Sequence, residues 1–205
     1  MAPAQSANIP VMIGCTKDEQ TLYNVGMPWW GKASEVDALA LLKKNPLIAA
    51  KADALWAAAK RAFPNDSPSY LYTDITSKTF AFTGSVTLAE RKSAQKAAPV
   101  FMYIWNWGAP LERGMLRAPH TAEIAFAFDN VDKGPIWLGI DAATKRLGAT
   151  TSATWVAFAR NGNPNSKEIP HWPAYDAATR ATMIFDTKPR VENDPYAEFR
   201  QLLNA

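Results

Sequence analysis

The sequence predicts an α/β fold, and three observations support that prediction. Residues 9–14 form a continuous apolar run ended by a glycine, which is typical of a strand buried on both faces of a parallel sheet. Residues 99–107 are rich in aromatic and branched side chains and predict a second central strand. Of the 205 residues, 48% are hydrophobic and 20% charged, a balance typical of proteins that form a core. We therefore expect helices packed on widely separated strands, residues 1–205 belonging to one domain.

Helix signals fill the long interval between the two strands. Ser34 and Asp37 form a capping-box pattern ahead of an apolar periodic segment. Asn45 and Pro46 predict the N-cap and first residue of another helix. Residues 69–98 predict further helix, with an interruption near the glycine at position 84.

The sequence after the second predicted strand indicates further helices and one short strand. Residues 148–162 predict a helix with Gly162 at its C-terminal cap. A short strand at 182–185 and a closing helix introduced by Asp194 and Pro195 follow. Two strands and a short third one make a small sheet for this much helix, so we expect further strands from outside this sequence.

Composition and charge exclude several classes of protein. The formal net charge is +3, and the basic residues occur as scattered pairs rather than long runs, so nucleic-acid binding is not expected. The single cysteine cannot form a disulfide within the chain. No stretch approaches the roughly 20 apolar residues that a membrane span needs.

Polar residues that could take part in catalysis follow both predicted strands. Asp18 and Glu19 come after the first strand, and His120, one of only two histidines, comes after the second. The carboxyl edge of an open α/β sheet is where ligands bind. A carboxylate there could hold one imidazole nitrogen while the other takes a proton from a nucleophile. An ordinary loop histidine and a first-turn helix acid are the simpler alternatives.

A metal site at His120 is not expected. His120 and Glu123 would need at least one further ligand. The other histidine, His171, lies in a proline-rich tail, and Cys15 ends an apolar run as a buried thiol would.

Four segments resemble, in order, those of type B carboxylesterases, a family of α/β-hydrolases. They are "IPVMIGCTKDEQ", "VFMYIWNW", "PHTAEIAFAFDN" and "GNPNSKEIPHWPAYDAATRATMIF". The resemblance runs from about residue 9 to the end. It implies a partial α/β-hydrolase fold made of the C-terminal strands and helices of the central sheet.

The resemblance also assigns roles to residues of the two loops. The triad acid falls on Glu19 and the triad base on His120. Glu123 matches the family's buried supporting carboxylate. Asp18, the competing acid, is interpreted as the residue that starts a helix.

The nucleophile of such an enzyme is missing from this sequence. α/β-Hydrolases order their triad as serine, acid and histidine, so the serine would precede Glu19. No G-x-S-x-G occurs, and neither Ser85 nor Ser152 has the flanking glycines. The resemblance therefore implies the C-terminal portion of a serine carboxylic-ester hydrolase. It would act on a small-molecule carboxylic ester of unassigned acyl and alcohol size without a cofactor, with the N-terminal part of the same esterase as partner, in cis or in trans.

Two alternatives stay open from the sequence. One is a non-catalytic esterase-like module for binding or adhesion, and the other is a truncated reading frame without independent activity. The presence of both Glu19 and His120 favours the catalytic interpretation.

Overall fold

The computed structural model describes residues 2–134, 138, 139 and 141–204. Its centre is a four-stranded sheet in the order β1-β2-β3-β4. The first three strands are parallel and the fourth is antiparallel to β3. The strands are β1 (Val11–Thr16), β2 (Val100–Trp105), β3 (Ala181–Phe185) and β4 (Arg190–Asn193).

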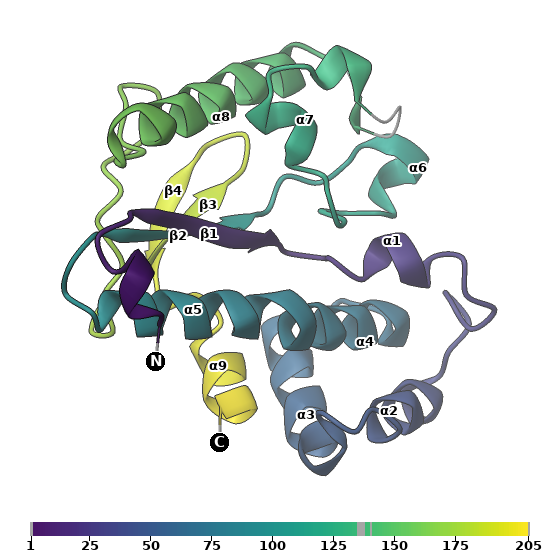
Figure 1. The fold of residues 1–205 in the computed structure, drawn as a ribbon. Helices are drawn as coiled ribbons and strands as arrows, with labels where there is room; N and C mark the ends of the chain where they lie inside the picture. The colour runs from purple at the N-terminus through teal and green to yellow at the C-terminus, as the bar shows by residue number, and fades with distance from the viewer. Residues whose placement is uncertain (1, 135–137, 140, 205) are drawn as a thin grey trace.

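Helices cover both faces of the sheet (Figure 1). One face carries the long excursion between β1 and β2 together with the closing helix. This layer comprises α2 (Glu35–Lys43), α3 (Ala52–Ala62), α4 (Pro68–Ser77), α5 (Thr83–Ser93) and α9 (Ala197–Asn204), with the short α1 (Thr21–Asn24) at one end. The other face carries α7 (Ile124–Ala127) and α8 (Ala142–Asn161), with α6 (Leu111–Gly114) beyond them.

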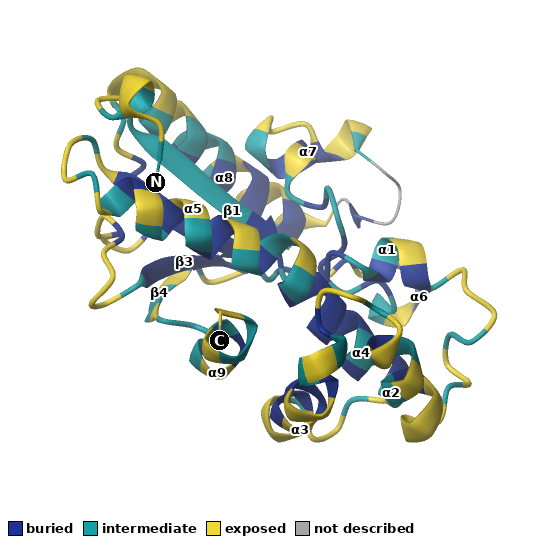
Figure 2. Cartoon of the chain, turned by 60° about the horizontal axis from the view of Figure 1, so that its bottom comes forward, coloured by how far each residue is buried: buried dark blue, intermediate teal, exposed yellow. Residues whose placement is uncertain are grey.

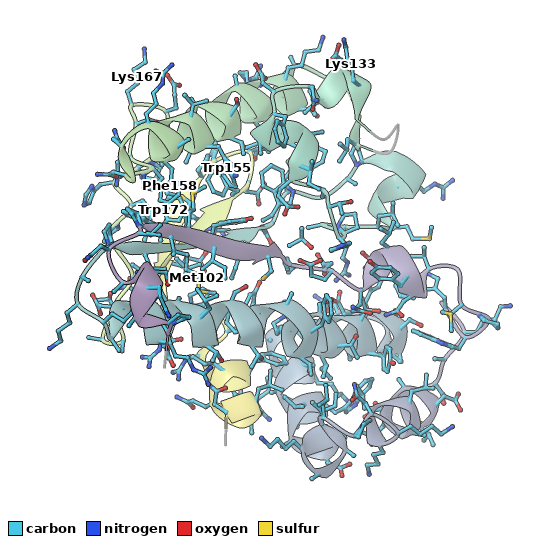
Figure 3. The ribbon with its side chains drawn as sticks, viewed as in Figure 1. Met102, Lys133, Trp155, Phe158, Lys167 and Trp172 are labelled. Carbon is cyan, nitrogen blue, oxygen red and sulfur yellow. The ribbon has the colours of Figure 1, made fainter. Side chains whose placement is uncertain are left out.

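An aromatic core fills the space between the sheet and α8. Trp172 packs edge-on against Phe101 and Phe185, with ring centroids 5.6 and 6.0 Å away. Trp155 and Phe158 approach the same core from α8 (Figure 3). Met102, on β2, belongs to the separate core on the opposite face. This double covering explains why the strands are apolar throughout rather than alternating.

The predicted parallel strands are present within two residues of their expected bounds, and the capping box of α2 is confirmed. Ser34 accepts from the Asp37 N–H, and the Asp37 carboxylate accepts from the Ser34 N–H. The C-terminal cap of α8 is also as expected, since Gly162 takes a left-handed φ of 73°. The strand β4 was not predicted.

Two expected helix starts were wrong, whereas the interruption expected near residue 84 is present. The Asn45 side chain accepts from the Leu47 N–H and closes a turn, so α3 begins only at Ala52, after a 3₁₀ turn. The interruption expected near residue 84 is a π-helical turn at Lys78–Phe82. Helix α8 starts earlier than expected, because the Asp141 side chain accepts from the Thr144 N–H and caps it.

A buried ion pair fixes the π-helical turn against the closing helix. Lys78 and Asp74 pair with each other, and both side chains are 2% exposed. The Lys78 ammonium lies 4.1 Å from the ring centroid of Tyr196 and 4.8 Å from that of Phe199. These cation–π contacts attach α9 to the end of α4.

Strand β1 lies at an open edge of the sheet. Within the described part of the chain, β2 is the only strand paired with it. Its first four residues are partly exposed, whereas β3 is buried throughout (Figure 2). Exposed apolar side chains lie beside it: Ile9 precedes it, and Leu88 lies on α5, which packs against it. An unpaired, apolar edge is a surface that another chain segment can extend.

We expect the 205-residue chain on its own to associate with itself through this edge. It should elute as oligomers on sizing and bind a hydrophobic dye, because unpaired backbone groups and apolar side chains lie together there. Leu88→Lys should weaken the association, whereas Val36→Lys, at an exposed position of α2 remote from β1, should not. A monodisperse monomer without dye binding would contradict this expectation.

Candidate active site

The acid-bearing turn directly continues β1. The Lys17 N–H donates to the Trp105 carbonyl at 2.8 Å and extends the β1–β2 ladder by one step. Glu19 is then turned back, and its Oε1 accepts from the Thr16 N–H at 2.7 Å. The Gln20 N–H donates to the hydroxyl of Ser77 on α4 at 3.0 Å. The Glu19 carboxylate is thus buried and fixed by the strand that precedes it.

The base-bearing loop follows β2 and is bonded to the acid-bearing turn. The Asp18 N–H donates to the Ala118 carbonyl at 3.0 Å, and the Ala118 N–H donates to the Asp18 carboxylate at 3.3 Å. The Thr21 hydroxyl donates to the Leu116 carbonyl at 2.6 Å. These bonds hold the residues just before His120 against the end of β1.

The structure brings Glu19 and His120 into direct contact. Glu19 Oε2 lies 2.5 Å from His120 Nδ1, although the two residues are 101 positions apart. The Glu19 side chain is 7% exposed and that of His120 is 39% exposed. The imidazole is therefore held by a buried carboxylate at one nitrogen while its side chain stays partly exposed. This arrangement suits a base whose Nε2 exchanges protons with a bound group.

The interpretation of Asp18 as a helix-start residue was wrong. The N-cap of α1 is Gln20, and no side chain caps that helix. The Asp18 side chain is instead 2% exposed and turns inward to the Ala118 N–H. No local sequence signal distinguishes these two roles, because the partner lies 100 positions away.

Glu123 lies close enough to the pair for the charges of Glu19 and His120 to affect the pKa of its carboxyl. Burial raises the pKa of its carboxyl, and the negative charge of Glu19 raises it further, against the opposing effect of His120. Its Oε2 is buried without a hydrogen-bond partner among the described residues.

The other chemically interesting side chains lie apart from this pair. His171 is exposed in the tail, and Ser85 donates to the Gly14 carbonyl of β1 at 3.3 Å. Burial, assisted by the Glu19 charge, raises the pKa of the Cys15 thiol. Within residues 2–134, 138, 139 and 141–204, no three His, Cys, Asp or Glu residues are grouped to hold a metal ion. The described helices include none long and apolar enough to cross a membrane.

A family model for carboxylesterases matches residues 1–202. The chain belongs to the carboxylesterase family. It is 31% identical over 208 aligned residues to the para-nitrobenzyl esterase of Bacillus subtilis, covering 99% of this chain and 39% of that esterase. It is 26% identical to the phenmedipham hydrolase of Pseudarthrobacter oxydans, covering 87% of this chain and 36% of that protein.

Solved structures confirm the predicted partial α/β-hydrolase fold. A carboxylesterase of Geobacillus stearothermophilus superposes with a TM-score of 0.76 at 26% identity. The match covers 95% of this chain and 40% of that esterase. The sequence therefore spans about 40% of the length of the carboxylesterases it matches.

Glu123 should make the stability of the chain depend on pH. Because its folded-state pKa is raised, the folded protein binds the proton more tightly than the unfolded chain does. Unfolding free energy should fall as pH rises from about 4.3 through the folded pKa, by at most about 1.4 kcal/mol per pH unit. Glu123→Gln cannot ionise and so does not lose stability in this way. The difference between its melting temperature and that of the parent should therefore shift in favour of the variant as pH rises.

Melting curves of both proteins between acidic and neutral pH check this prediction. Glu168→Gln, at an exposed position of the tail, controls for the general effect of removing one negative charge. Parallel curves for parent and Glu123→Gln would show that the Glu123 carboxyl is not protonated preferentially in the folded state.

Proposed function

We propose that this chain is the C-terminal portion of a serine carboxylic-ester hydrolase, with residues 1–205 forming part of one esterase domain. Its contribution is the acid and base of the catalytic triad. The observation that supports this most strongly is the 2.5 Å contact between buried Glu19 and partly exposed His120. Membership of the carboxylesterase family supports ester hydrolysis as the reaction.

In the proposed reaction, His120 Nε2 takes the proton of a serine hydroxyl as the serine oxygen attacks the ester carbonyl. The same proton then passes to the leaving alcohol, and an acyl-serine remains. Water then attacks the acyl-serine as His120 Nε2 takes its proton. That proton passes to the departing serine oxygen, the carboxylic acid is released and the serine hydroxyl is restored. Glu19 keeps the imidazole in the tautomer with the proton on Nδ1 and stabilises its charged form.

The serine in this proposal comes from outside the 205 residues, which contain no G-x-S-x-G. We assign the open edge of β1 as the surface that receives the N-terminal part. That edge continues into the acid-bearing turn, so a strand paired there would end close to His120. The relatives' greater length agrees with such a division, since the match covers 39% of the para-nitrobenzyl esterase.

On its own, the chain should not hydrolyse esters. A base and an acid without nucleophile or oxyanion hole lose both the covalent route and the main charge stabilisation. Turnover of p-nitrophenyl acetate and labelling by a serine-directed phosphonate measure this. Stoichiometric labelling of any serine of this chain would overturn the proposal. Fusion behind the N-terminal part of the Bacillus subtilis para-nitrobenzyl esterase, here called the joined protein, should restore turnover.

In the joined protein, His120→Ala should lower kcat about 10⁵- to 10⁶-fold and Glu19→Gln about 10⁴-fold. Asp18→Asn should cost less, because an amide oxygen can still accept the Ala118 N–H. His171→Ala, which removes the exposed histidine, is the control and should leave kcat unchanged. Equal losses in kcat for Asp18→Asn and Glu19→Gln would show that the triad acid has been assigned to the wrong residue.

A further inference from the structure

Helix α4 is bonded to both loops of the candidate site. Near its C-terminal end, the Ser77 hydroxyl accepts from the Gln20 N–H of the acid-bearing turn at 3.0 Å. Near its N-terminal end, the Tyr70 hydroxyl donates to the Met115 carbonyl of the base-bearing loop at 2.9 Å. One ten-residue helix therefore sets the position of one loop relative to the other.

Arg117, three residues before His120, contacts Tyr70 of α4 and Asp66, which lies just before that helix. Its Nη1 and Nη2 each donate to one oxygen of the Asp66 carboxylate at 2.6 Å, in a forked pair. Its guanidinium lies 3.6 Å from the centroid of the Tyr70 ring. The Arg117 and Asp66 side chains are only 26% and 15% exposed. A planar guanidinium can fork and stack in this way, whereas a lysine ammonium cannot.

The backbone around His120 explains why such an attachment is needed. Arg117 has a φ of 53° and Thr121 a φ of 68°, so His120 lies between two non-glycine residues with left-handed φ. Side chains disfavour this conformation, and it persists where surrounding contacts determine it. The Arg117 carbonyl also accepts from the Ala109 N–H at 2.6 Å, which closes the loop behind it.

We propose that Arg117, clamped by Asp66 and Tyr70, is a positioning residue that keeps His120 Nδ1 on Glu19. It acts through the backbone between residues 117 and 120 rather than on the reacting atoms. The proposal rests on the function proposed above. A displacement of a catalytic group by about 1 Å costs up to about 100-fold in rate, so a clamp three residues away affects turnover.

The first test is kinetic and uses the joined protein with p-nitrophenyl acetate. Arg117→Ala should lower kcat about 10- to 100-fold and change KM less than about twofold, because orientation is lost rather than ester binding. Arg117→Lys, which keeps the charge but not the fork, should lie between Arg117→Ala and the parent.

Arg200→Ala is the matched control. Arg200 also forks onto a carboxylate, with Nε and Nη2 at 2.9 and 2.7 Å from Asp194, and these side chains are 14% and 25% exposed. Removing this pair should leave kcat and KM within about twofold of the parent, because it joins α9 to the residues before that helix and does not adjoin His120.

The second test is spectroscopic and does not depend on turnover. The proton between His120 Nδ1 and Glu19 should give a far-downfield proton resonance in the joined protein, assigned by its loss in His120→Gln. Arg117→Ala should shift or broaden this resonance, and Arg200→Ala should leave it in place. A purely structural role for Arg117 would lower the melting temperature without changing the resonance.

The outcomes separate the two proposals. A parent joined protein that lacks both turnover and the resonance contradicts the proposed function. A parent that has both, with Arg117→Ala behaving like Arg200→Ala, overturns the positioning role alone. If Arg117→Ala does not fold, Tyr70→Phe is used in its place. This substitution removes only the hydroxyl that donates to the Met115 carbonyl. An unchanged kcat and an unchanged resonance in both Tyr70→Phe and Arg117→Lys would then overturn the clamp.

Discussion

The parallel pairing of β1 with β2 is the constraint on which the candidate site depends. In this register Thr16 is paired with Trp105, so the two strands end side by side. The chain leaving β1 carries Glu19, and the chain leaving β2 reaches His120 after a loop that is bonded back to the end of β1. Two residues 101 positions apart are therefore brought into contact. The buried faces of the sheet keep this pairing rigid.

Three carboxyl groups are gathered at this edge of the sheet, and the structure accommodates each differently. Glu19 accepts from the Thr16 N–H and contacts His120, so its charge is matched by hydrogen bonds. Asp18 accepts from the Ala118 N–H and joins the loops. Glu123 has one buried oxygen without a hydrogen-bond partner among the described residues, and burial raises the pKa of its carboxyl. Of the three, Glu19 is the one in contact with the imidazole, as an orienting acid requires.

Local signals in the sequence predict the parts of the fold that local physics determines. Continuous apolar runs indicate β1 and β2, and the Ser34–Asp37 pair indicates the start of α2, because each depends on neighbouring residues. Asn45 fits both an N-cap and a turn, and its surroundings select the turn. Strand β4 pairs with the edge of β3, a contact between separate segments of the chain.

In the candidate site, too, some features could be predicted from the sequence and others could not. Glu19 and His120 could be predicted from their places after strands and from the family resemblance. The contacts that hold them could not, because Asp66 and Arg117 are 51 positions apart and Asp18 finds its partner 100 positions away. Neither pairing leaves a periodic or motif-like signal. Such supporting contacts become visible only when the chain is folded.

A high-resolution structure of the joined protein after reaction with a serine-directed phosphonate tests the central claim most directly. The account predicts a phosphonylated serine whose oxygen lies within hydrogen-bond distance of His120 Nε2, while Glu19 remains on Nδ1. A phosphonylated residue out of reach of His120, or an imidazole that has left Glu19 for another partner, would contradict it.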